Sequence, residues 1–310
     1  MELVFEQKVY HGALEIAISP DKSRVAISSE RKITILDTVH FQRIVTIPIS
    51  HATSMIFLSD SAKMLILNTT GILYFWDGDT VEKLGKWAVP RWAETPLFYS
   101  GGSYAFWTLD GVVWRYNINL RTMDKIYSSS KDLVICKCSD GQVRLIGYRR
   151  GIPRQALDLT TIDYDGNVIS SVQTDRSVYT HCMGIPCWTN SNTVVFSALA
   201  KSQGIFHASL TSYLYLINTV NGEVKLQRYG HNYEDSGDCY HGTGMVAEVY
   251  PVLSKDVVLY TADKLEYQFR IGKDFFDASD KINPPTQAHF LDSRVLVGSW
   301  KYFYVFRIQS

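Results

Sequence analysis

The sequence lacks the features that mark several large classes of protein. Basic and acidic residues balance at 31 each, so the formal net charge is zero and the basic surplus that drives nonspecific nucleic-acid binding is absent. No apolar run approaches the roughly 18 residues of a membrane-spanning helix. The first ten residues alternate charged and apolar side chains, unlike the basic start and apolar core of a signal peptide. We therefore expect a cytoplasmic protein that binds neither nucleic acid nor membrane.

Motifs for catalysis and for cofactors are also missing. No G-x-S-x-G elbow is present, which argues against a serine hydrolase. The stretch Gly242-Thr243-Gly244 lacks the later glycine and lysine of a phosphate loop. The five cysteines are an odd number, and no second pair at zinc-finger spacing accompanies Cys182 and Cys187, so we expect buried free thiols. The sequence predicts no catalytic residue, cofactor or metal ion.

The sequence contains a five-residue motif, called the word below, that recurs seven times. Each copy is mostly apolar and aromatic and ends in Asp, Asn or Arg. The copies end at Asp37, Asp77, Asn117, Asp163, Asn218, Arg270 and Arg307. Steps of about 40 to 50 residues filled with short strands are the signature of a β-propeller with one four-stranded blade per repeat. The sequence therefore predicts an all-β fold, a seven-bladed propeller of four-stranded antiparallel blades.

Turn residues give the order of strands within each repeat. An apolar inner strand precedes a polar turn, a second strand follows, and the recurring word forms the third strand. The first turns are expected near residues 19–22, 59–60, 100–102, 139–141, 190–192, 254–256 and 292–293. After the third strand, Asp165-Gly166 and Asn221-Gly222 are strong hairpin signals.

The two ends of the chain are expected to complete one blade. The last word ends at Arg307, three residues before Ser310, so the seventh repeat lacks a fourth strand, whereas Leu3 to Val9 is a strand without a blade. We expect residues 1–10 to pair with residues 302–310, because this closure removes exposed sheet edges. The whole chain, residues 1–310, is then a single propeller domain.

The repeats resemble those of the WD-repeat family. The Ser19-Pro20-Asp21 turn and the Trp76-Asp77 dipeptide at the end of a third strand look like that pattern. Histidines shortly before inner strands add to the resemblance: His11, His51, His181 and His241. The fifth repeat, with Tyr213 to Asn218 and a Gly222-Glu223 turn, looks more like the propellers of TolB-type proteins and prolyl oligopeptidases. Both resemblances imply binding on the faces of a disc.

Four longer connections are expected on one face of that disc. They cover residues 148–155, 172–186, 200–212 and 229–244. Connections between the second and third strands, and between successive blades, emerge on the same side of a propeller, so these segments gather over blades four to six. Binding residues are often carried by loops on a rigid scaffold.

Candidate binding residues fall mainly in these segments. Arg149, Arg150, Arg154 and Arg176 can form an anion clamp, because guanidinium groups match carboxylates and phosphates, or they are solvated loop charges. The other candidates are histidines, carboxylates and aromatic residues: His181, His207, His231, Tyr233, Asp235, Asp238, Tyr240, His241 and Trp300. Histidines at equivalent blade positions lie a blade width apart, which favours a structural role over shared metal ligation.

Two functions follow from these observations. The first is a non-catalytic binding or scaffold propeller that engages a protein segment, or an anionic small ligand, on the expanded face of blades four to six. The alternative is a lyase or hydrolase acting on an acidic carbohydrate, with His181, His207, His231 or His241 as base or metal ligand. Convergence of three of these histidines in one cavity favours the enzyme, because sites for small molecules are concave.

Overall fold

The computed structural model describes residues 1–9, 15–59, 62–86, 98–99, 103–180, 186–189, 192–202, 209–228, 238–242, 244–250, 255–277 and 283–308. Their regular structure consists of antiparallel β-strands and one short helix, α1 (Lys273–Asp277). In this described part of the chain, no helix is long and apolar enough to cross a membrane.

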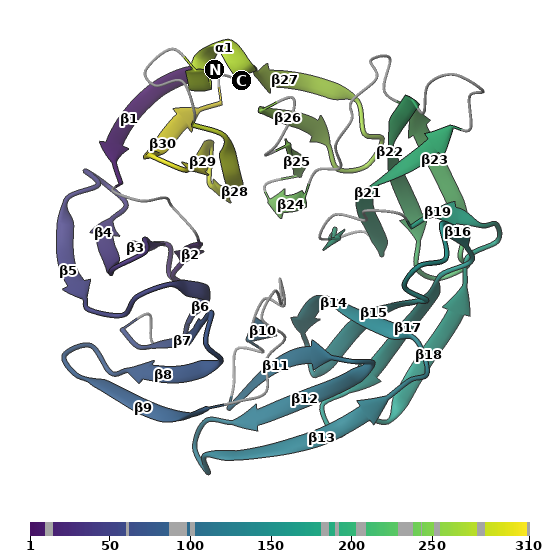
Figure 1. Cartoon of the computed structure of the whole chain (residues 1–310), viewed down its shortest axis with the longest axis horizontal. Helices are drawn as coiled ribbons and strands as arrows, with labels where there is room; N and C mark the ends of the chain where they lie inside the picture. The colour runs from purple at the N-terminus through teal and green to yellow at the C-terminus, as the bar shows by residue number, and fades with distance from the viewer. Residues whose placement is uncertain are drawn as a thin grey trace.

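The strands form seven four-stranded sheets, which are the blades of a propeller. In blades one to six, the strands follow chain order from the axis of the ring outwards (Figure 1). Blade one comprises β2 (Ile16–Ile18), β3 (Arg24–Ser28), β4 (Ile33–Asp37) and β5 (Arg43–Ile47). Blade two comprises β6 (Ala52–Phe57), β7 (Met64–Asn68), β8 (Ile72–Trp76) and β9 (Val81–Lys86). Blade three comprises β10 (Phe98–Tyr99), β11 (Tyr104–Leu109), β12 (Val112–Asn117) and β13 (Thr122–Ser128).

The remaining blades complete the ring, and a separate two-stranded ribbon lies beside blades four and five. Blade four comprises β14 (Asp132–Ser139), β15 (Gln142–Tyr148), β17 (Asp158–Asp163) and β18 (Val168–Gln173), and the ribbon comprises β16 (Arg154–Gln155) and β19 (Val178–Tyr179). Blade five comprises β20 (Cys187–Trp188), β21 (Thr193–Ser202), β22 (Ser209–Asn218) and β23 (Val224–Arg228). Blade six comprises β24 (Asp238–Gly242), β25 (Met245–Tyr250), β26 (Asp256–Thr261) and β27 (Tyr267–Ile271). Blade seven comprises β28 (Pro285–Leu291), β29 (Arg294–Ser299), β30 (Tyr302–Arg307) and β1 (Glu2–Lys8).

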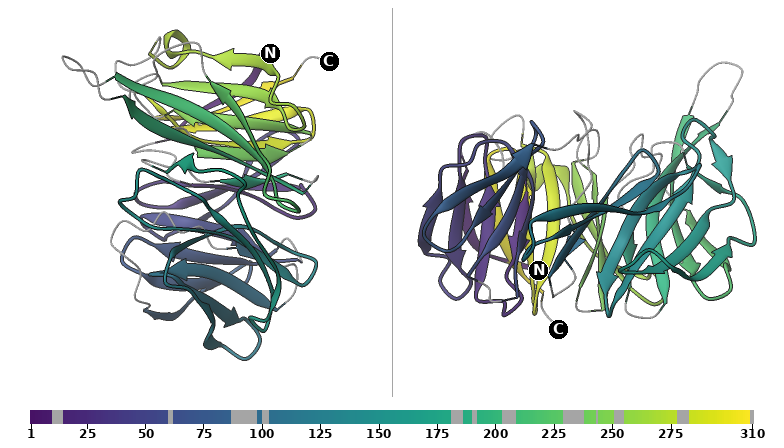
Figure 2. Two further views of the ribbon diagram at one scale, coloured as in Figure 1. Left: turned by 90° about the vertical axis from the view of Figure 1, so that its right-hand side faces the viewer. Right: turned by 90° about the horizontal axis from the view of Figure 1, so that it is seen from below.

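The predicted seven-bladed ring and its closure are both confirmed. The seven blades are arranged in a ring around a central axis (Figures 1 and 2). Strand β1 pairs antiparallel with β30, from Glu2 opposite Arg307 to Lys8 opposite Tyr302. The Phe5 ring stacks on Phe41 of blade one with the centroids 4.9 Å apart. The first strand therefore supplies the outer edge of the last blade and also packs against the first.

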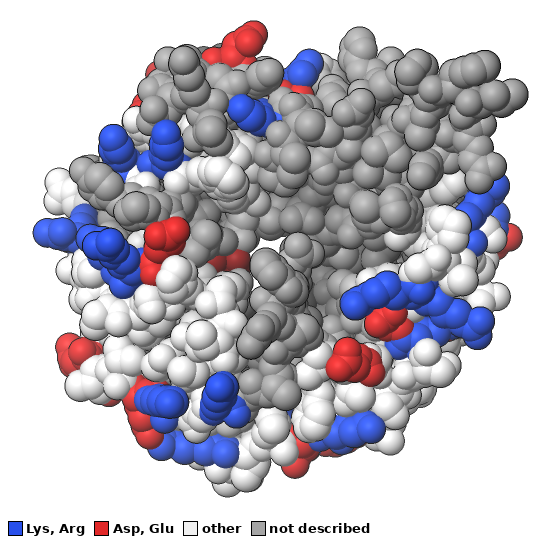
Figure 3. Space-filling view, in the orientation of Figure 1, with Lys and Arg blue, Asp and Glu red and all other residues white. Residues whose placement is uncertain are grey.

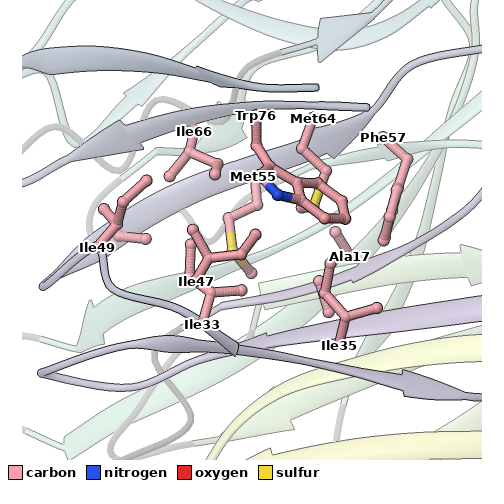
Figure 4. Close-up of a cluster of buried hydrophobic side chains, with 12 residues drawn as sticks. Ala17, Ile33, Ile35, Ile47, Ile49, Met55, Phe57, Met64, Ile66 and Trp76 are labelled. Atoms are coloured by element: carbon pink, nitrogen blue, oxygen red, sulfur yellow. The ribbon is translucent and has the colours of Figure 1, made fainter. Parts of the chain in front are cut away.

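The apolar core lies between the blades. Seven clusters of buried side chains are described, one at each junction of neighbouring blades. At the junction of blades one and two, Ile33 and Ile35 face Met55, Met64 and Trp76 (Figure 4). Complete burial of a side chain of this size contributes about 1.5–3 kcal/mol. Every blade depends on both neighbours for its core, which is why the ring has to close.

Side chains at the ends of the third strands explain why the five-residue word recurs. Asp77 Oδ1 accepts hydrogen bonds from the backbone N–H groups of Asp79 and Thr80, at 3.0 and 2.7 Å. Asn117 Oδ1 accepts equivalent bonds from Asn119 and Leu120, at 3.0 and 2.9 Å. Similar bonds are made by Asp37, Asp163 and Asn218. An Asp or Asn here satisfies the backbone donors of the turn that leads to the outer strand.

The strand assignment for blade six is wrong in the sequence-based prediction. The word ending at Arg270 lies on β27, the outer strand, whereas the third strand is β26. The turn expected at residues 254–256 as the first of this blade precedes β26 and is therefore the second. The reason is local: β26 ends in Thr261, whose Oγ1 accepts the N–H of Glu266 at 3.1 Å. A threonine thus stands in blade six where blades one to five carry an Asp or Asn.

Candidate functional site

The strand order places the longer connections on one face of the ring. Because the strands of each blade are antiparallel, the connection from the second to the third strand leaves the sheet on the same side as the connection to the next blade. We call this side the loop-rich face. It carries the β15–β17 connection, the β18–β20 connection and the beginnings of β22 and β24.

The ribbon β16–β19 links two of these connections. Arg154 lies opposite Tyr179 in the ladder, and Gln155 opposite Val178. The Gln155 side chain accepts the N–H of Arg149 at 2.7 Å, and its Nε2 donates to the Arg149 carbonyl at 2.8 Å. The same Nε2 lies 3.1 Å from Thr180 Oγ1. One glutamine side chain thus ties the β15–β17 connection to the segment that leaves β19.

A stack of rings fixes the ribbon to blade five. The Arg154 guanidinium lies over the Tyr179 ring, 5.4 Å from its centroid. Tyr179 stacks on Tyr213 of β22, with centroids 5.3 Å apart, and Tyr213 is followed by the buried Tyr215 at 6.3 Å. The Tyr215 hydroxyl accepts the backbone N–H of Tyr179 at 3.1 Å, and burial raises the pKa of Tyr215 to about 12. The stack runs from an exposed arginine into the core.

The four arginines of the predicted clamp do not all point to one place. Arg149, Arg150 and Arg154 are exposed on the β15–β17 connection. Arg150 Nη2 lies 3.8 Å from Asp132 Oδ1, a long contact. Arg176 is exposed too, but its Nη2 donates to the backbone carbonyl of Val224 in blade five. Three arginines therefore share the ribbon region, and Arg176 braces blade four against blade five.

We call five arginine and tyrosine side chains of this region, all exposed or half-buried, the ribbon surface: Arg149, Arg150, Arg154, Tyr179 and Tyr213. Figure 3 shows basic side chains gathered over blade four on the visible face, with fewer acidic ones beside them. Another basic residue nearby, Lys131, is neutralised by Asp158, with Nζ and Oδ2 2.6 Å apart. The ribbon surface combines several guanidinium groups with flat aromatic rings. Such a set of groups binds carboxylates, backbone carbonyls and apolar stems of a partner.

The sequence-based search missed Tyr213 and Tyr215 as members of this region. Both side chains lie on the same side of β22, because alternate residues of a strand share a face. Their spacing of two is visible in the sequence, but their contact with Tyr179 depends on the path of the β18–β20 connection. That path cannot be predicted from the hydrophobic pattern of the sequence or from its turn residues.

The expectation of a loop over residues 229–244 is wrong for its final part. Residues 238–242 form β24, the innermost strand of blade six, so Asp238, Tyr240 and His241 lie on a strand. The Tyr240 ring packs against His289 of blade seven, with centroids 5.1 Å apart. His241 lies near the end of β24 that is farther from the loop-rich face. The structure thus separates His241 from the arginines of the ribbon surface.

The pKa of His241 is lowered, first by burial and second by the positive charge of Lys137. Lys137 belongs to β14, the inner strand of blade four, so the two residues come from separate blades across the ring. His289 is more strongly affected, because burial lowers its pKa to about 4. Burial therefore favours the neutral form of both imidazoles.

Trp300 lies apart from the ribbon surface. It is 52% exposed and follows β29 in blade seven, where its backbone N–H donates to the Pro284 carbonyl at 3.1 Å. It shares the loop-rich face, since it lies between the second and third strands of its blade. Five other candidates fall outside the described residues: His181, His207, His231, Tyr233 and Asp235.

The described cysteines lie on inner strands, and none of them forms a disulfide. Cys136, Cys187 and Cys239 are buried, as expected, and Cys138 is half-buried. Burial raises the pKa of Cys136, Cys138 and Cys187. Over the described ranges, no three or more His, Cys, Asp or Glu side chains gather where they could hold a metal ion.

Solved structures with a similar fold are known, but no relative is found by sequence. No family model matches the chain, and no curated protein matches it. A solved structure of Kuenenia stuttgartiensis hydrazine synthase is similar over 96% of both chains, with a TM-score of 0.72 and 14% identity. U3-55K is similar over 97% of this chain and 98% of its own, with a TM-score of 0.67 and 13% identity. The WD40 repeats of RRP9 are similar over 98% of both chains, with a TM-score of 0.66 and 13% identity.

These likenesses show a seven-bladed β-propeller of the type that WD40 repeats build. At such low identity they show the fold alone. An enzyme and WD40 proteins occur among the similar structures, so the architecture does not select a function. The function has to be argued from the residues that the loop-rich face presents.

Proposed function

We propose that this protein is a non-catalytic binding propeller that engages an acidic segment of a partner protein at the ribbon surface. The supporting observation is the stack of Arg154, Tyr179 and Tyr213, which holds an exposed, arginine-bearing ribbon against a buried tyrosine. A surface fixed in advance binds with less loss of conformational entropy than a mobile loop. Tyrosine and arginine are also among the residues that most often dominate binding energy at protein interfaces.

The charges favour an acidic partner. Arg149 and Arg150 are adjacent and exposed, and Asp132 lies near only one of them. Carboxylates of a partner can bind these guanidinium groups through paired hydrogen bonds. Because the groups are exposed, added salt screens the attraction, and we expect affinity to fall as ionic strength rises.

The enzyme alternative receives less support. A lyase or hydrolase of the kind considered needs a histidine beside the arginines that hold the substrate carboxylate. Among its four candidate histidines, His241 is the one that the structure describes, and it lies toward the other face. The WD40 proteins with a similar fold are consistent with a binding role, although that likeness concerns architecture.

The test compares two pairs of charge reversals on the same face. The Arg149→Glu/Arg150→Glu variant changes the ribbon surface. The Arg31→Glu/Lys32→Glu variant changes two exposed basic residues that are adjacent in the sequence. They lie in the β3–β4 connection of blade one, on the same face of the ring. Immobilised wild-type and variant proteins are used to capture partners from a lysate of the source cells, and the bound proteins are quantified by mass spectrometry.

The proposal expects a set of proteins bound by the wild type and the blade-one variant but lost from the ribbon variant. For a purified member of that set, the affinity of the ribbon variant is expected to be at least tenfold lower than that of the wild type. This difference between the two proteins is expected to become smaller as salt is added. A set of bound proteins that is the same for all three chains would contradict the proposal. So would a partner whose binding depends on Arg31 and Lys32 alone.

A further inference from the structure

A second interaction surface lies on the outer rim of blade four. Each blade ends in an outer strand whose far side faces no further strand of its sheet: β1, β5, β9, β13, β18, β23 and β27. Such an edge presents backbone N–H and C=O groups to any extended chain that approaches it. Proteins commonly protect their edges with charged side chains, which oppose the pairing of a further strand.

One of these seven outer strands has no such protection. The other six carry charged side chains, among them Glu6, Arg43, Lys83, Lys125, Lys225 and Arg270. Strand β18, with the sequence VISSVQ, is the only one of the seven described outer strands without a charged residue. Val168 and Ile169 are 54% and 53% exposed. In Figure 1, β18 lies at the outer rim of the ring.

A register shift does not account for this difference. Thr161 pairs with Ser170 and Ile162 with Val168, so the ladder skips Ile169. Bulges of this kind also protect edges, but similar shifts occur in β1, β5, β9, β13 and β27, which carry charges as well. Beyond the shift, Ser170 to Gln173 pair regularly with β17.

We propose that β18 is a docking edge for an extended, uncharged segment of a partner protein, which adds to blade four as a fifth strand. Backbone hydrogen bonds supply the affinity in this mode of recognition, and alternate side chains supply the selectivity. The small side chains of Ser170 and Ser171 leave room for β-branched residues on the added strand. Charged residues border the edge, with Asp165 before it and Asp175 and Arg176 after it, so the uncharged partner segment spans about six residues.

The size of the edge favours a flexible segment over a second ring. Six residues of strand extend about 20 Å. Two rigid propellers that met along this line alone would bury much less than the roughly 1,200–2,000 Å² of a stable protein interface. Gly222 of blade five lies against the Gln173 carbonyl at one end of this edge. An extended peptide, in contrast to a second ring, can satisfy its backbone along the rest of it. It does not need any other part of the ring.

The experiment is a selection from a phage library of random ten-residue peptides against the immobilised full-length chain. Two variants separate this edge from the others. Ser170→Lys places a charge on β18, and Met123→Lys places the same charge on the outer strand β13 of blade three. Amide exchange of the wild type with a selected synthetic peptide reports where the peptide binds.

We expect the selected peptides to share an uncharged stretch rich in β-branched residues. Their affinity is expected to fall at least tenfold in Ser170→Lys and to remain unchanged in Met123→Lys, and the peptide is expected to slow amide exchange within residues 168–173. The proposal is overturned by a selection that enriches no such peptide, or by peptides that bind Ser170→Lys as well as the wild type. A dimer in analytical ultracentrifugation that Ser170→Lys abolishes would also overturn it, because the occupant would then be a second copy.

Discussion

The ring of Tyr213 on blade five lies 5.3 Å from the ring of Tyr179 on the ribbon and is inclined to it by 24°. This contact joins the added ribbon to the regular part of the propeller. Two further contacts hold the same segment: Tyr179 donates its N–H to the Tyr215 hydroxyl, and Thr180 donates its N–H to the Pro153 carbonyl. The position of the ribbon arginines therefore depends on a tyrosine of a different blade.

Replacing Tyr213 by alanine is expected to loosen the ribbon while the ring stays folded. A stacked aromatic pair contributes about 0.5–1.5 kcal/mol beyond its buried area, so amide exchange at Tyr179 and Thr180 should become about 2- to 10-fold faster. Tyr213→Phe keeps the ring and is the matched control, with exchange near that of the wild type. Equal rates in Tyr213→Ala and in the wild type would show that the stack does not hold the ribbon.

The caps of the third strands predict a dependence of stability on pH. Asp77 has a lowered pKa, caused first by the hydrogen bond from the Thr80 backbone and then by the one from Asp79. Because its pKa in the folded state lies below the unfolded value of about 3.9, its stabilising effect is complete above pH 5 and is lost as the pH falls through the folded pKa.

Asp77→Ala and Asp77→Asn separate the charge of this cap from its hydrogen bonds. The alanine variant is expected to melt below the wild type at pH 7, and the difference should shrink as the pH falls from about 5 to 3. The asparagine variant keeps an acceptor, as Asn117 does in blade three, and should melt closer to the wild type at pH 7. Melting curves at several pH values test this, and a difference between alanine variant and wild type that grows with acidity would contradict it.

Most of the fold could be predicted because the signals for it are local. Asp37, Asp77 and Asn117 each cap the turn beside them, so the same residue type recurs at the same place in successive blades. The closing strand could be predicted by counting strands. The strand assignment of blade six was wrong because its cap is Thr261, and a threonine does not match the Asp or Asn expected at that position.

The candidate site could be predicted only in part. The position of Arg149, Arg150 and Arg154 on one connection follows from the sequence. The direction of Arg176 does not, because its hydrogen bond ends on a backbone carbonyl of the neighbouring blade, which is a matter of how the blades pack. The position of His241 was predicted wrongly, because the strand assignment of blade six placed it in a connection and not on the inner strand β24.

Packing between blades predicts an uneven effect of glycine substitutions. Gly166, in the turn between β17 and β18, has φ +92°, and a Cβ placed there would lie 1.9 Å from the carbonyl oxygen of Ile126 in blade three. Gly151 has φ +81°, but a Cβ there would have no atom within 4 Å. Both alanine variants accept a strained backbone, at about 1–2 kcal/mol, and only Gly166→Ala must also move the neighbouring blade.

We therefore expect Gly166→Ala to be less stable than Gly151→Ala by about 1–3 kcal/mol, the range of overpacking in a well-filled interior. Denaturant unfolding at pH 7 measures the difference, with the wild type as reference. Equal losses in the two variants would mean that the turn of blade four does not press on blade three.

His241 on β24 and Lys137 on β14 belong to inner strands of two different blades. Burial is the larger cause of the lowered pKa of His241, and Lys137 is the second. A positive neighbour disfavours the imidazolium form, so its removal has to raise the pKa, whereas the effect of burial remains. In Lys137→Gln, the pKa of His241 is therefore expected to be higher than in the wild type and still below 6.5.

Lys125→Gln on the outer strand β13 is the control, because it removes the same charge at the rim. Histidine NMR signals followed over pH give both values. If the pKa of His241 does not change in Lys137→Gln, or rises equally in Lys125→Gln, then His241 does not face the inner strand of blade four, and the assignment of residues 238–242 to the innermost strand would have to be abandoned.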